Sequence, residues 1–167
     1  MVPIWVDLGY RVGPRLYLGV FGQYAFGLSP HGYCDRALDC SESVTRFGAN
    51  AHYHFLPDAL IDPWVGLGFG YEFFSFKVSG TIPVVQWDID ASGTESGFEF
   101  ANFQLGGDIR LSPSFALGPF IAFSLAQYSS ATGGANIGMS GPTSVNEGIQ
   151  DKKLHSWLMF GMRVVYK

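Results

Sequence analysis

Strict alternation of apolar residues with polar or small ones runs through seven segments and restricts the fold more than any other feature. Phe103 and Leu105, for example, alternate with Asn102, Gln104 and Gly106. A period of two is that of a β-strand whose two faces differ, and no segment has helical periodicity. We therefore predict an all-β, antiparallel chain. The alternating segments are residues 3–12, 15–27, 45–56, 64–79, 98–111, 114–128 and 154–166.

The connections between these segments alternate in length. Gly13-Pro14, residues 57–63 and Ser112-Pro113 are short, whereas the other three connections are long and polar. Short turns at one rim and long loops at the other are typical of up-and-down transmembrane β-barrels. We predict one barrel domain over residues 1–167. The predicted long loops are residues 28–44, 80–97 and 129–153.

The number of visible strands is odd, which suggests that one strand of the barrel is missing. Single-chain bacterial barrels have an even number of strands, and seven are visible, so we expect an eighth. Tracing the alternation back from Gly13 places residue 3 at the long-loop rim, so we expect a missing strand before it, together with an export signal. The run from Ile82 to Ile89 could add a hairpin above the membrane without changing this parity.

The composition of the polar face indicates that it lines the interior. The seven polar faces contain no lysine and one glutamate, Glu72, and the whole chain is 14% charged, against about 25% in soluble domains. Glycine makes sense in a narrow lumen, where it leaves room for Trp5, Tyr17, Phe120 and Trp157. The glycines of this face are Gly9, Gly19, Gly48, Gly66, Gly68, Gly70, Gly106, Gly118 and Gly161.

The apolar face is then expected to point outward into lipid, where Arg or Lys at mid-bilayer costs about 2–4 kcal/mol. The predicted belt comprises Leu8, Leu18, Ala51, Phe69, Leu105, Phe123 and Phe160. Aromatic residues near the ends of the outward runs suit a girdle at the membrane interfaces, although aromatics are also frequent in strands generally. They are Tyr10, Tyr24, Phe26, Tyr53, Phe55, Tyr71 and Tyr166.

Charged residues of both signs are expected to face the lumen. Buried charges must be paired, so we predict an internal network that plugs the barrel, with a polar permeation path as the alternative. The predicted interior polar network is Asp7, Arg11, Arg46, Glu72, Asp108, Arg110 and Arg163.

Other candidate sites are few. Cys34 and Cys40 share one polar segment and are predicted to form a disulfide, which implies an oxidising compartment; two free thiols are the alternative. His52 and His54 share a strand face but lack a third ligand, so we expect interior polar residues rather than a metal site. No cofactor is indicated, and a net charge of −4 without a basic patch argues against nucleic acid.

Two strand–turn–strand runs carry a resemblance to a known family. Residues 8–19, LGYRVGPRLYLG, and residues 108–120, DIRLSPSFALGPF, resemble units of the small outer-membrane β-barrel superfamily, which includes the OmpA membrane domain and OmpW-like proteins. The resemblance implies a bacterial cell outer membrane location and the lipid bilayer as partner. It carries no catalytic signature, and Lys167 follows Tyr166 where the family usually ends on an aromatic residue.

Three functions remain open at this point. The first is a non-enzymatic barrel with a structural or surface-interaction role through its long loops. The second is OmpW-like passage of a small hydrophobic molecule, which a cavity lined by Phe21, Phe120 and Trp157 would favour. The third is a soluble lipocalin-like barrel with its faces reversed. We do not expect an enzyme, because His155 and Ser156 point opposite ways and no GxSxG motif is present.

Overall fold

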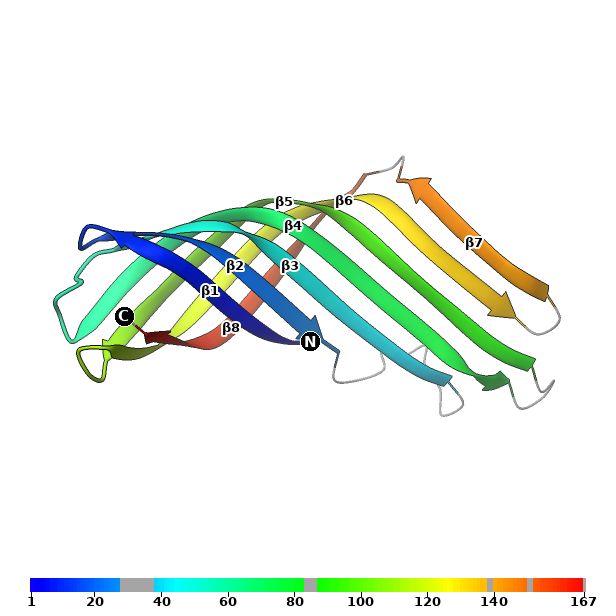
Figure 1. The fold of residues 1–167 in the computed structure, drawn as a ribbon, viewed down its shortest axis with the longest axis horizontal. Helices are drawn as coiled ribbons and strands as arrows, with labels where there is room; N and C mark the ends of the chain where they lie inside the picture. The colour runs from blue at the N-terminus through cyan, green and yellow to red at the C-terminus, as the bar shows by residue number, and fades with distance from the viewer. Residues whose placement is uncertain (28–37, 83–86, 138–139, 150–151, 167) are drawn as a thin grey trace.

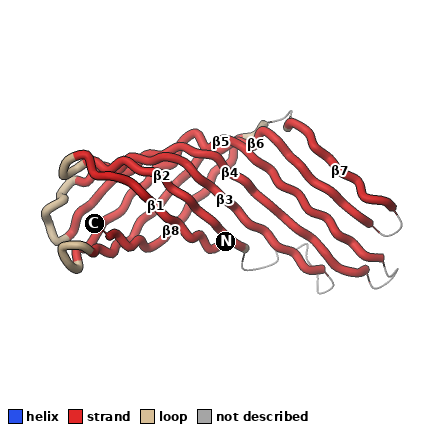
Figure 2. Tube along the Cα trace, in the orientation of Figure 1, coloured by secondary structure: helices blue, strands red, loops and turns tan. Residues whose placement is uncertain are grey.

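The computed structural model describes residues 1–27, 38–82, 87–137, 140–149 and 152–166. Their only regular secondary structure is β-strand (Figures 1 and 2), and among them no helix is long and apolar enough to cross a membrane. The strands are β1 (Val2–Val12), β2 (Leu16–Phe26), β3 (Leu38–His54), β4 (Ile61–Ile82), β5 (Trp87–Arg110), β6 (Phe115–Ile137), β7 (Ser140–Gly148) and β8 (Leu154–Tyr166).

All eight strands belong to one antiparallel sheet that curves into a half-barrel. Its order is β1-β2-β3-β4-β5-β6, after which β6 pairs with two strands. The first part of β6 pairs with β8, and the part beyond Ser130 pairs with β7. The short turns gather at the end of the sheet where the described chain reaches Tyr166, at the left of Figure 1. The predicted all-β, up-and-down antiparallel arrangement is confirmed, and the seven predicted segments correspond to β1–β6 and β8.

The predicted long loops are shorter than expected, because strand pairing continues far into them. β4 extends to Ile82, β5 begins at Trp87, and β3 begins at Leu38. The segment 129–153, predicted as a loop, contains the end of β6 and all of β7. The prediction was wrong because these segments are rich in Gly and Ser and lack apolar alternation. Backbone ladders need no apolar side chains, and a hairpin in water can carry polar residues on both faces.

A β-bulge lies in β5 rather than in β4. β4 keeps an unbroken register with β3 from His54 to Leu38. In β5, Asn102 pairs with Gly68 while Glu99 pairs with Gly70, which leaves an extra residue on β5. A bulge of this kind reverses the faces of the residues that precede it.

The apolar face points outward along the part of the sheet that surrounds the lumen, as predicted. Leu8 and Phe160 are each 70% exposed, and Leu105 is 56% exposed. Leu18, Phe69 and Phe123 are also exposed, and Ala51 is partly exposed. The concave face is the buried one, and it is mainly polar: its fully buried side chains include Arg46, His52, Glu72, Glu99 and Asn102. A soluble protein has the opposite arrangement.

Interior glycines leave room for large rings. A Cβ atom on Gly106 would lie 2.4 Å from the ring of Trp64, and a Cβ on Gly161 would lie 2.7 Å from the ring of Phe120. Both distances are shorter than any van der Waals contact. The predicted role of glycine as lumen space is therefore confirmed at these two positions.

Candidate functional site in the lumen

The centre of the concave face holds a buried ion pair between neighbouring strands. Arg46 of β3 pairs in register with Glu72 of β4, and the Arg46 Nε lies 2.6 Å from the Glu72 Oε2. Glu99 of β5 approaches the same guanidinium at 3.7 Å. The three side chains are at most 2% exposed. Two carboxylates thus share one guanidinium away from solvent.

The second oxygen of Glu72 gathers donors from the far side of the lumen. Tyr128 of β6 donates to Oε1 at 2.5 Å, and Trp157 of β8 donates to it at 3.2 Å. The His155 Nε2 lies 2.9 Å from the same oxygen. Glu72 therefore joins β4 to β6 and β8 through side chains alone, because these strands are not neighbours in the sheet.

Neighbouring polar groups extend this central network. The Asn102 amide donates to Glu99 at 2.8 Å, and Arg46 donates to the Ser124 hydroxyl at 3.1 Å. The Arg46 guanidinium also lies 5.4 Å from the centre of the Trp157 ring, within cation–π range. The network therefore joins inward side chains of β3, β4, β5, β6 and β8 through direct bonds.

A second cluster lies nearer the short turns and is built around Asp108 of β5. Arg163 of β8 forms two bonds with its carboxylate, at 2.9 and 2.7 Å, and Trp64 donates its indole N–H at 3.1 Å. The Arg163 guanidinium also lies 3.8 Å above the Trp64 ring. His52 stacks on Trp64 with ring centroids 4.7 Å apart, and its Nδ1 lies 3.3 Å from the Arg163 Nη1.

The remaining predicted charges do not form ion pairs in the described residues. Asp7 accepts a hydrogen bond from the Asn50 amide at 2.5 Å. Arg11 donates to the Pro14 carbonyl and contacts His54. Arg110 donates to the carbonyls of residues 57 and 58 at the turn rim. The structure thus brings four of the seven predicted residues into carboxylate–guanidinium pairs, namely Arg46, Glu72, Asp108 and Arg163.

Several network members were not predicted from the sequence. Glu99 has the parity of the outward residues Ala101 and Phe103, and only the bulge turns it inward. Trp64 is the first residue of an alternating segment, so the sequence suggests the edge of a strand rather than an inward position. Tyr128 has the parity of the inward residues Ser124 and Ala126, so its phase was available as a signal.

The histidines and cysteines give no metal site within the described part of the chain. His54 is bonded to Asp62 at 2.8 Å, and His52 stacks between Tyr17 and Trp64. Among the described residues no three His, Cys, Asp or Glu side chains group closely enough to hold an ion. Cys40 lies near the start of β3, but Cys34 lies outside the described residues, so the disulfide stays a prediction.

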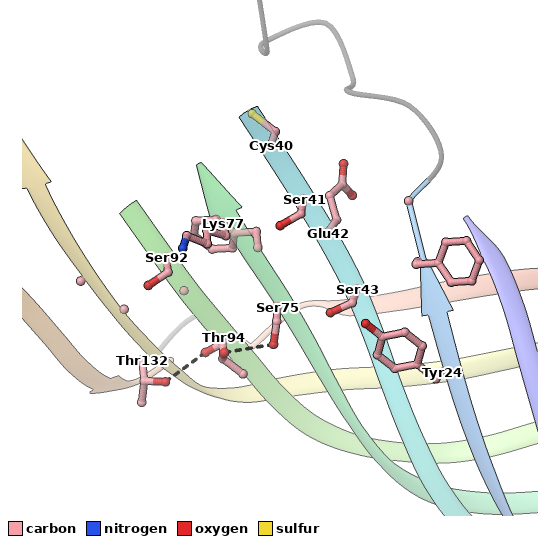
Figure 3. Close-up of a pocket in the computed structure, with 16 residues that line it drawn as sticks. Tyr24, Cys40, Ser41, Glu42, Ser43, Ser75, Lys77, Ser92, Thr94 and Thr132 are labelled. Atoms are coloured by element: carbon pink, nitrogen blue, oxygen red, sulfur yellow. Dashed lines mark hydrogen bonds between the residues drawn. The ribbon is translucent and has the colours of Figure 1, made fainter. Parts of the chain in front are cut away.

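Beyond the lumen, the outward face changes character along the long hairpins. The register aligns Ser43, Ser75, Thr94 and Thr132 in one row across β3, β4, β5 and β6, as Figure 3 shows. The Ser75 and Thr94 hydroxyls are 3.1 Å apart, and Thr132 donates to the Thr94 carbonyl at 3.4 Å. Ser43 lies four residues from Phe47, which is 51% exposed, so this hydroxyl row continues the outward face.

Comparisons with protein-family models, with curated proteins and with solved structures find no match to this chain. The function must therefore be argued from the geometry described above.

Proposed function

We propose that the chain is an outer-membrane β-barrel protein of a Gram-negative bacterium, with a plugged polar interior and a structural or surface-interaction role carried by its long hairpins. The observation that supports this most strongly is the inversion of the two faces. Apolar side chains such as Leu8 and Leu105 point outward, whereas Arg46, Glu72 and Glu99 are fully buried inside. A bilayer is the surrounding that stabilises such an exterior.

The extent of the apolar belt fits a bilayer. On β4 the outward residues run from Val65 through Leu67 and Phe69 to Tyr71 and Phe73. This run is as long as the roughly 9–11 residues that a tilted strand needs to cross the hydrocarbon region. Past it the outward face turns to the hydroxyl row defined above. A change from apolar through aromatic to hydroxyl residues is the order expected across a membrane interface.

The bonded polar networks of the lumen favour an anchoring role over conduction. The networks around Glu72 and Asp108 connect β3, β4, β5, β6 and β8 through the interior. Rigid barrels of this size hold side chains rather than a water path. Function then belongs to the hairpins beyond the belt, where β4, β5, β6 and β7 extend furthest in Figure 1.

The two alternative functions receive less support. A hollow of about 840 Å³ extends from the gap between β1 and β8 into the lumen, where Gln104 and Phe120 line it. Phe120 favours passage of a hydrophobic molecule, but Phe21 and Trp157 are not part of the lining. A soluble lipocalin-like barrel requires an apolar interior, opposite to the arrangement found. His155 contacts Glu72 inside the lumen, whereas Ser156 is exposed on the other face of β8. Because these two side chains lie on opposite faces, the arrangement fits a non-enzymatic role.

Trypsin treatment of intact cells that express the chain behind an added export signal tests this proposal. Lys152 and Lys153 lie at the long-hairpin side and are exposed, whereas Arg15 is exposed in a short turn at the opposite rim. We expect cleavage after the lysines in intact cells, and cleavage after Arg15 only once the envelope is permeabilised. Protection of the lysines with cleavage at Arg15 would reverse the orientation. Recovery of the protein in the soluble fraction would overturn the membrane proposal.

A further inference from the structure

The long hairpins carry a polar hollow on the outward face of the sheet. It has a volume of about 550 Å³, within the range typical of small-molecule sites, and is lined by β2, β3, β4, β5 and β6. Two rows of side chains form its floor (Figure 3). The first is the hydroxyl row, and the second, two residues further along the strands, aligns Ser41, Lys77 and Ser92. Residues two apart on a strand share a face, so both rows point outward.

Polar groups in the hollow are available to a ligand. Ser92 and Lys77 are exposed, and within the hollow neither has a hydrogen-bond partner among the described residues (Figure 3). Hydroxyls donate and accept, and an ammonium donates. Neighbouring strands lie about 4.8 Å apart and the two rows about 6–7 Å apart, so these groups form a flat lattice. Such a lattice complements a sugar ring, whose own hydroxyls donate and accept around its edge.

Aromatic residues of β2 form one wall of the hollow. Phe26 lies beside Ser43 in the register, and Tyr24, two residues before it, is 50% exposed. The C–H faces of a sugar ring are apolar and can pack against aromatic rings, while its hydroxyls need polar partners. An aromatic wall beside a hydroxyl floor therefore favours a sugar over an inorganic ion or an acyl chain.

The charges in and around the hollow favour a sugar with a compact anionic substituent. Lys77 is the cation of the lining, and among the described residues no carboxylate forms an ion pair with it. Glu42 also lines the hollow, from the opposite parity of β3, and the next row on the outward face carries the exposed Asp39 and Asp90. An ammonium binds a phosphate as a point charge, whereas the bordering carboxylates would repel an extended anionic surface.

The position of the hollow indicates that the sugar belongs to a lipid. Phe47, Tyr71 and Phe98 align in register on the outward face, and Ser75 lies four residues beyond Tyr71. This separation is about 13 Å along the strand, or about 9 Å in height for a tilt of about 45°. The headgroup layer on each side of the hydrocarbon core is about 5–7 Å thick. A lipid whose chains lie against these rings would place a sugar headgroup in the hollow without leaving the bilayer.

We propose that this hollow binds the sugar headgroup of a phosphorylated glycolipid, with the sugar hydroxyls on the two rows and a phosphate at Lys77. The lipid chains lie below it, against the rings of Phe47, Tyr71 and Phe98. The inference rests on the proposed function, because only a chain embedded in a bilayer presents the hollow to lipid.

The experiment uses the full chain refolded in phosphatidylcholine vesicles that contain diphosphoryl lipid A, a phosphorylated disaccharide lipid, as the probe. Native mass spectrometry after extraction into detergent counts the probe molecules that each chain retains, over a series of lipid A fractions. We expect one molecule per chain. Lys77→Gln removes a charged hydrogen bond and Ser92→Leu fills the hollow, so each should lower the apparent affinity about tenfold. Lys153→Gln, the same change at an exposed lysine outside the hollow, is the matched control and should bind as the parent does.

Two further probes separate the chemistry of the ligand from its source. Phosphatidylglycerol is anionic but has no sugar ring, and glucosamine phosphate has the sugar and the phosphate but no lipid chains. We expect neither to be retained. Retention of phosphatidylglycerol as strongly as lipid A would show that the hollow recognises charge alone. Equal affinity for glucosamine phosphate would assign the hollow to a soluble sugar. Either result would overturn the inference.

The variants and the embedding of the chain separate the remaining outcomes. Equal retention of lipid A by the parent, Lys77→Gln and Ser92→Leu would place the lipid elsewhere on the barrel and overturn the inference. No retention by a chain that is embedded in the vesicles would also overturn it, while leaving the proposed function intact. A chain that does not associate with vesicles at all would instead overturn the proposed function.

Discussion

Replacing Glu72 with glutamine is expected to lower the free energy of unfolding by about 3–5 kcal/mol, because the change leaves Arg46 buried without its close partner. Both carboxylate oxygens are in use: one lies 2.6 Å from the Arg46 Nε, and the other accepts from Tyr128 and Trp157. Glutamine keeps one acceptor oxygen and presents an N–H₂ donor at the other position. Arg46 then retains Glu99 at 3.7 Å as its carboxylate partner, which is too distant to compensate fully.

The assay is urea unfolding of the refolded protein in lipid vesicles, followed by circular dichroism so that changes near Trp157 do not disturb the signal. Asp90→Asn is the matched control, since it removes a carboxylate from an exposed strand position and should change the free energy by less than about 0.5 kcal/mol. Equal stability of Glu72→Gln and Asp90→Asn would refute the reasoning and show that Glu72 is solvated.

Three further predictions concern packing, the second cluster and the cysteines. Gly118→Ala should cost about 1–3 kcal/mol, because its Cβ would lie 1.8 Å from the Gly107 carbonyl oxygen, whereas Gly107→Ala meets no atom within 4 Å; equal urea midpoints for the two variants would contradict this. The Trp64→Phe variant should lose about 1–3 kcal/mol of unfolding free energy, because phenylalanine cannot donate the hydrogen bond to Asp108. A variant as stable as the parent in the same urea titration would argue against that bond. Mass spectrometry of unreduced peptides should find Cys34 joined to Cys40, and alkylation of both thiols in the exported protein would exclude the disulfide.

The strands and their faces could be predicted from the sequence because the pattern is local. Leu105 and Gln104 differ in polarity, and a strand places adjacent residues on opposite faces. Which face points outward followed from composition, since a water-exposed outer surface without lysine is implausible. Arg46 and Glu72 could be placed inside for the same reason, although their pairing depends on the register between β3 and β4, which a single strand does not reveal.

The rest depends on interactions that local pattern does not contain. The inward position of Glu99 results from a bulge, which inserts one residue without a sequence signal. β7 forms in a segment with no apolar alternation, where pairing with β6 alone defines the strand. Arg110 has the parity of the lumen residues but lies at the rim, where turn carbonyls replace a carboxylate as its partners.

The central claim is that the apolar outer face lies in the bilayer, and lipid-depth quenching tests it most directly. Single cysteines at Leu105 and at Gln104, adjacent on β5 but on opposite faces, are labelled with a fluorophore after refolding in vesicles of brominated lipid. The account predicts strong quenching of the label at Leu105 and little at Gln104, which is 5% exposed within the lumen. Equal quenching at both positions, or quenching at Gln104 alone, would contradict it.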